Sequence, residues 1–174
     1  MALHSMFEGL FTRALHVDAA LQAKLEAKGY DHRRPLPRYP VDLWEECVDL
    51  VVLELMPAVP RDDAWVQVGR LFINGYFQTL VGKFIATSLP FLTPRTFLNR
   101  VPRFMSTGLE HLEAHVTWNG EHEATLAIGG PRFIASAFME GILAASFERM
   151  KFTPRDFQRA VQHERHSSVT VTLR

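Results

Sequence analysis

Two pairs of histidines are the residues of this sequence most able to hold a metal ion. His111 and His115 are four residues apart, a spacing that places both imidazoles on one face of a helix. Alternating apolar residues around them indicate a strand instead, where positions four apart are separated by about 13 Å. His163 and His166, with Glu164 between them, could hold a metal weakly, but no third and fourth ligands at a recognisable spacing accompany them. We therefore predict no metal site.

Side chains that could act as nucleophiles have surroundings unsuited to catalysis. Ser88, Ser136 and Ser146 fall in predicted helices, and the motif Gly-x-Ser-x-Gly, which exposes a reactive serine in hydrolases, does not occur. Cys47 is the single cysteine and lies among apolar residues, which predicts a buried, unreactive thiol and excludes internal disulfides. We predict no catalytic residue and expect that the protein is not an enzyme.

The remaining candidates for a functional site are a haem site and a single glutamate, Glu140. A haem iron would need His16, His32 or a strand histidine as its ligand, and none of these lies in the middle of an apolar helix. We predict no cofactor and keep a haem-binding sensor as the third alternative. Glu140 lies in an otherwise apolar predicted helix; it either faces solvent, which we favour, or meets a ligand or an arginine in a buried position.

The composition is that of a folded globular protein with no overall charge. Of 174 residues, 47% are apolar and 22% are charged, and 19 cationic residues balance 19 acidic ones. Nucleic acids and anionic membranes select a clustered cationic excess, so neither is predicted as a partner. The longest apolar run, residues 76–92, contains Gln78, Lys83 and Pro90 and is too short to span a membrane. We expect one domain over residues 1–174, located in the cytoplasm because no secretory signal is visible.

Apolar residues at helical spacing predict about six helices. Asp18 is the expected N-cap of the second helix and Gly29 its left-handed terminator. The fifth is expected to be kinked or broken by Pro102. The predicted helices cover residues 5–15, 18–27, 41–55, 62–88 with a bend near Gly69 or Gly75, 93–106, and 131–150.

Beyond Gly108 the apolar period changes from 3.6 to 2, which predicts strands. Alternating residues on both sides of Asn119-Gly120 indicate a hairpin. A three-residue loop over residues 118–120 would pair Leu112 with Leu126 and place His115 opposite Glu123. Residues 157–161 and 169–173 are expected to form a second hairpin. The fold class is therefore α+β, with helices packed on a small four-stranded antiparallel sheet in the order helices, hairpin, helix, hairpin.

Small residues recur inside the fourth and sixth predicted helices. Glycine inside a helix costs about 1 kcal/mol relative to alanine, so its recurrence implies either close helix contact or space for a ligand. We favour close helix contact. Space for a ligand is the other explanation, and it defines a candidate pocket. Its predicted wall consists of Gly75, Phe77, Gly82, Phe84, Ala137, Phe138 and Gly141.

Two segments carry a resemblance to a known family. Residues 74–82 (NGYFQTLVG) and 94–108 (PRTFLNRVPRFMSTG) resemble an uncharacterised, heavily duplicated protein family of myxobacteria, over nearly the whole chain; that family implies no activity. The order of elements is similar, more remotely, to the haem-nitric-oxide-binding, vinyl-reductase-like and transport-particle group of ligand-binding folds. This sequence lacks the Tyr-x-Ser-x-Arg haem motif and the cysteines of a metal cluster, so the resemblance implies an apolar pocket.

The leading hypothesis is a non-enzymatic sensory or regulatory module that binds a small apolar molecule between the fourth and sixth predicted helices. The alternative is a protein-interaction or dimerisation module without a ligand, which would use the sheet edge or an exposed apolar helix to bind a second copy or a signalling protein.

Overall fold

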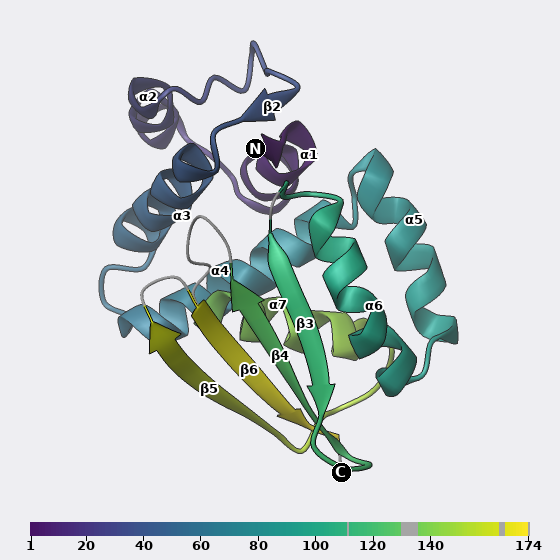
Figure 1. Cartoon of the computed structure of the whole chain (residues 1–174). Helices are drawn as coiled ribbons and strands as arrows, with labels where there is room; N and C mark the ends of the chain where they lie inside the picture. Colours follow the sequence, from purple (N-terminus) through teal and green to yellow (C-terminus); the bar gives the residue numbers. More distant parts are fainter. Residues whose placement is uncertain (111, 130–135, 164–165, 174) are drawn as a thin grey trace.

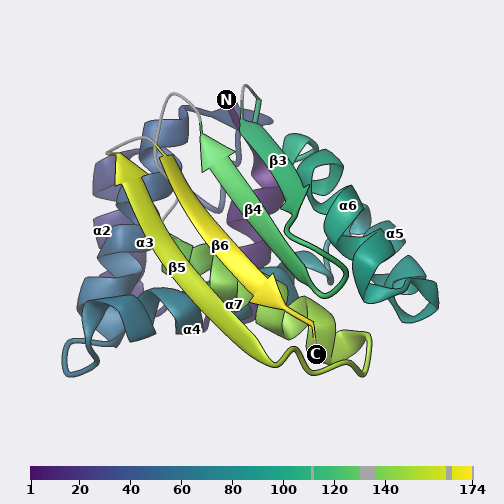
Figure 2. The same cartoon turned by 60° about the horizontal axis from the view of Figure 1, so that its bottom comes forward.

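The protein consists of helices packed on one face of a four-stranded antiparallel sheet, as predicted (Figure 1). The computed structural model describes residues 1–110, 112–129, 136–163 and 166–173, without the side chains of residues 161–163. Figure 2 shows the sheet in front and the helices behind it. The apolar side chains that alternate along the strands therefore meet the helices.

The sheet has the strand order β3-β4-β6-β5, with every neighbouring pair antiparallel. The hairpin of β3 (Glu113–Trp118) and β4 (Glu123–Gly129) precedes α7 (Ser136–Arg149) in the chain. The hairpin of β5 (Asp156–His163) and β6 (His166–Thr172) follows it. The predicted order of hairpin, helix and hairpin is confirmed.

Helices dominate the part of the chain before the sheet. A short two-stranded ribbon there pairs β1 with β2. The predicted start of α7 at Pro131 lies outside the described residues. The elements before the sheet are β1 (Ala2–Leu3), α1 (His4–Phe7), the π-helix η1 (Glu8–Ala14), α2 (Ala19–Lys28), β2 (Arg38–Tyr39), α3 (Val41–Leu55), α4 (Arg61–Tyr76), α5 (Leu80–Ser88), the 3-10 helix η2 (Leu89–Phe91) and α6 (Pro94–Ser106).

Local capping signals explain why several helix ends agree with the sequence. The Asp18 carboxylate accepts a hydrogen bond of 2.8 Å from the backbone N–H of Leu21, and Gly29 ends α2 with φ +110°. Thr93 caps α6 by accepting from the N–H of Thr96. α6 continues across Pro102 to Ser106, so it is not broken there.

The predicted helix over residues 62–88 is wrong, because two helices occupy this range. The Thr79 hydroxyl accepts a hydrogen bond from the N–H of Gly82 at 3.1 Å and donates one to the carbonyl of Tyr76 at 2.7 Å. Thr79 thereby ends α4 and caps α5 with one side chain. The apolar pattern runs through this turn without interruption, which is why it indicated a single helix.

The predicted register of the first hairpin is also wrong, although its faces are right. The structure pairs Val116 with Leu126 and Trp118 with Ala124, and the N–H of Asn119 donates to the carbonyl of Glu123 at 2.9 Å. The loop is therefore longer than three residues, and His115 lies opposite Ala127. The error displaces the pairing by an even number of residues, so the same side chains face the core.

An aromatic cluster connects the N-terminal segment to the rest of the core. The ring of Phe7 lies 4.4 Å from that of Tyr39 and 5.2 Å from that of Trp44, between ring centroids. The Trp44 ring is in turn 5.2 Å from Phe72 on α4 and 6.4 Å from Phe138 on α7. These contacts place α1, α3, α4 and α7 around one apolar core.

The contact between α4 and α7 brings the two backbones together. A Cβ atom added at Gly141 of α7 would overlap the carbonyl oxygen of Val66, and one added at Gly69 of α4 would overlap the carbonyl oxygen of Phe138. Neither position has room for a side chain, because the neighbouring atoms belong to the backbone and cannot turn away. The glycines at these two positions set the distance between the helices.

Replacing Gly141 with alanine should therefore lower the stability by about 1–3 kcal/mol, as overpacking does. Helix propensity alone would raise it by about 1 kcal/mol, so the sign of the change identifies the cause. Gly108→Ala, beyond the end of α6, is the control for an added methyl group alone, since a Cβ there meets the Met6 side chain and not backbone. Urea unfolding measures both, and a Gly141→Ala protein as stable as the wild type would contradict the close contact.

Candidate functional site

An apolar cavity of about 90 Å³ lies where α4, α6 and α7 meet. Phe72 and Ile73 of α4, Phe97 and Val101 of α6, and Leu143 of α7 form part of its wall. The surface of the cavity is almost entirely apolar, and the wall includes three methionines, whose flexible side chains adapt to irregular space. This arrangement suits a small apolar molecule.

Contacts with β3 hold α6 in its place as one wall of the cavity. The Trp118 indole N–H donates a hydrogen bond of 2.9 Å to the Asn99 side-chain oxygen. The Arg95 guanidinium lies 4.1 Å from the centroid of the Trp118 ring, which is cation–π geometry. The first strand of the sheet thus positions the helix that completes the cavity.

Two of the seven residues predicted to form a pocket line this cavity. Phe138 is buried in α7, and Phe77 is the buried residue that follows α4. The predicted pocket was drawn from the predicted helices over residues 62–88 and 131–150, which correspond to α4, α5 and α7. The cavity lies between α4 and α7 and has α6 as a further wall. The role of either phenylalanine in ligand binding stays a prediction.

The other five predicted residues lie outside the cavity wall. A Cβ atom at Gly75 would overlap the carbonyl oxygen of Gly9, and one at Gly82 would overlap that of Tyr76. With Gly141, these glycines are explained by close backbone contact, the explanation favoured in the sequence analysis. Ala137 is buried in α7, whereas Phe84 is 75% exposed on α5.

Tyr76 is a polar residue among those that line the cavity. Its hydroxyl is buried and makes no well-formed hydrogen bond among the described residues. Burial raises the pKa of this phenol, while the nearby hydroxyls of Thr107 and Ser5 act in the opposite direction. Tyr76 is therefore a neutral group able to donate one hydrogen bond.

Glu140 pairs with an arginine, which was the less favoured of the two predictions made for it from the sequence. Its carboxylate lies 3.2 Å from the Arg159 guanidinium of β5, which also lies 3.4 Å from Asp62 of α4. Burial raises the pKa of Glu140 above its ordinary value; Arg159 opposes the rise, and Asp156, Asp63 and Asp62 add to it. The group joins α4, α7 and β5 and lies outside the cavity.

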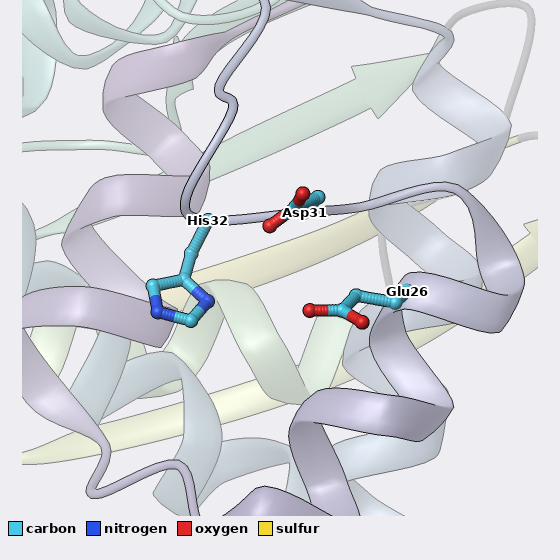
Figure 3. A group of neighbouring side chains, drawn as sticks. All are labelled: Glu26, Asp31 and His32. Carbon is cyan, nitrogen blue, oxygen red and sulfur yellow. The ribbon is translucent and has the colours of Figure 1, made fainter.

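Three exposed or half-buried side chains at the end of α2 form a second cluster (Figure 3). Glu26, Asp31 and His32 each direct one ligand atom toward a common space, and these atoms lie within 4.8 Å of one another. One imidazole and two carboxylates can hold a divalent metal. One oxygen of Glu26 already accepts from Gln22 and one of Asp31 from the N–H of Arg33. The short spacing of Asp31 and His32 after Glu26 is the only sequence signal for it.

The histidine pairs of the sequence do not form such a group among the described residues. His115 is exposed on β3, and His166 is exposed at the start of β6. His111 and Glu164 lie outside the described residues, and the side chain of His163 is not described. No helix in the described ranges is long and apolar enough to cross a membrane.

Sequence comparison identifies one matching family. The profile of the family described as "Protein of unknown function (DUF2378)" matches residues 2–173. This agrees with the expected resemblance to an uncharacterised family. No curated protein sequence matches the chain.

Solved H-NOX structures have the same fold at low sequence identity. A variant of the H-NOX protein designated Cs has a TM-score of 0.72 at 13% identity, and the match covers 100% of this chain and 97% of that chain. An Fe(II) unliganded H-NOX variant from K. algicida gives 0.67 at 13%, covering 100% and 97%. An oxygen-binding H-NOX domain related to soluble guanylate cyclases, in its oxygen complex, gives 0.66 at 15%, covering 98% and 92%. The remote resemblance to the haem-nitric-oxide-binding group is confirmed as a likeness of fold.

The raised pKa of Glu140 predicts a particular dependence of stability on pH. The folded protein binds this proton more tightly than the unfolded chain, so the contribution of Glu140 is most favourable below the ordinary pKa and is lost as the pH rises through the folded pKa. Relative to wild type, Glu140→Gln should therefore gain stability as the pH rises from about 4 toward 7.

Urea unfolding at a series of pH values measures the difference between the two proteins. Glu148→Gln is the matched control, an exposed glutamate of α7 that also pairs with an arginine, Arg70. A Glu140→Gln protein whose stability runs parallel to wild type over this range would contradict the assignment.

Proposed function

We propose that this chain, which belongs to the DUF2378 family, is a non-enzymatic sensory or regulatory module that binds a small apolar ligand. The observation that carries the proposal is the apolar cavity between α4, α6 and α7, in a fold whose solved examples include an oxygen complex. The likeness to those structures supports a ligand-binding sensor by analogy of fold.

The size of the cavity limits the ligand. An engineered apolar cavity of roughly 150 Å³ accepts benzene, and this cavity is smaller, at about 90 Å³. The ligand we propose is therefore a diatomic gas or a short hydrocarbon.

A haem-binding sensor is the second candidate, and the fold favours it. The titles of the matched structures refer to haem and Fe(II) in those proteins. The described cavity wall here does not fit haem, because a porphyrin needs a pocket several times larger, on the order of 300 Å³ or more. It contains neither histidine nor cysteine, and its possible iron ligands are methionine thioethers and the Tyr76 phenol. Tyr76 is the one oxygen candidate, and its raised pKa disfavours the phenolate that iron would require.

Xenon is a suitable probe for the first proposal because it is apolar and small. We expect xenon to shift the amide NMR signals of residues along α4, α6 and α7. Val101→Phe, which fills the cavity, should remove these shifts, and Val116→Phe, which adds the same group at a partly exposed position outside the wall, should keep them. Ile142→Phe replaces Val101→Phe if that protein does not fold. Shifts that are absent in the wild type, or that persist in the filled variants, would refute a ligand in this cavity.

An absorption spectrum separates the two candidates. Protein produced with added haem precursor should show no Soret band. A stoichiometric Soret band would instead assign the protein to the haem-binding candidate, and its loss in Tyr76→Phe would identify the ligand to the iron.

A further inference from the structure

Large apolar side chains are exposed along α5 and η2. Leu80 is 76% exposed, Phe84 75% and Phe91 87%, and Val81 lies beside them at 40%. The residues that α5 buries are the small ones, Gly82 and Ala86. The helix therefore packs on the protein through its small face and presents its large apolar face outward, the reverse of an ordinary surface helix.

An open groove of about 620 Å³ runs between α5 and α6, which lie beside each other at the outer side of the molecule (Figure 1). Leu80, Val81 and Phe84 form its α5 side, and Phe104 lies on its α6 side. Leu80 and Phe84 are one helical turn apart, so they project in the same direction. An apolar patch of this kind marks an interaction site.

The groove is positively charged, because the charged residues that line it are arginines. Arg100 and Arg103 of α6 line it, and neither takes part in an ion pair within the described parts of the chain. The sequence contains no acidic residue between Asp63 and Glu110. Both helices that form the groove are therefore without negative charge.

We propose that the groove between α5 and α6 binds an amphipathic helix of a partner protein, with an apolar stripe flanked by acidic side chains. The stripe covers Leu80 and Phe84, and the acidic side chains pair with Arg100 and Arg103. Helix-in-groove recognition uses this combination of apolar anchors at i, i+3, i+4 and i+7 with charged flanks. The positive charge of the groove favours an acidic partner helix and disfavours a basic one.

A second copy of this chain is disfavoured by the same arginines. A symmetric dimer through this surface would bring the arginines of both copies together, and like charges in an interface are repulsive.

Two synthetic helical peptides with the same leucine stripe test the proposal, one with glutamate and the other with lysine at the flanking positions. Fluorescence anisotropy should show that the glutamate peptide binds at least about tenfold more tightly. Phe84→Ser should weaken it by about tenfold or more, the usual effect of removing an aromatic anchor. Arg100→Glu combined with Arg103→Glu should reverse the preference between the two peptides.

The controls are Leu53→Ser, which removes an apolar side chain of similar exposure from α3, and Arg33→Glu, which reverses an exposed charge outside the groove. Neither should change the affinity. Equal affinity for the two peptides, no binding of either at millimolar concentration, or displacement by oleate would each overturn the proposal. A dimer in sedimentation that Phe84→Ser converts to monomer would overturn it in favour of a second copy.

Discussion

The backbone contact between α4 and α7 is the constraint on which the rest of the structure depends. Gly69 and Gly141 let the two helices approach until each meets the other's carbonyl oxygens. At this separation Phe72 and Phe138 face each other, with ring centroids 5.4 Å apart. The same two rings line the cavity. A wider crossing would enlarge the cavity and separate the aromatic cluster into two parts.

Local signals made much of the fold predictable. α3 has the predicted ends, and α2 and α6 begin at the predicted caps, because these positions depend on nearby residues only. The turn at Thr79 was missed because the apolar pattern continues through it. The register of the first hairpin was missed because the loop length depends on the bond between Asn119 and Glu123, while the alternation that fixes the faces is insensitive to an even displacement.

The candidate site was less predictable, for a physical reason. In a sequence, a glycine that packs against another backbone cannot be distinguished from a glycine that borders empty space. Here Gly75, Gly82 and Gly141 meet backbone, and the space lies instead among large side chains of three helices. α6 was recognised as a helix, but its position against α4 and α7 depends on tertiary contacts such as Trp118 with Asn99. Ile85 and Phe104 line both the cavity and the outer groove, so these two side chains separate them.

The position of β6 in the sheet has a consequence for the order of folding. β4 pairs with β6, whose residues follow more than 36 positions later in the chain, and within the described residues β5 joins the sheet only through β6. Until residues 166–172 are available, the first hairpin has an unpaired edge and β5 has no partner. Pairing over such a separation is slow compared with helix formation. We therefore expect the helices to form early during synthesis and the two hairpins to join only once β6 is available.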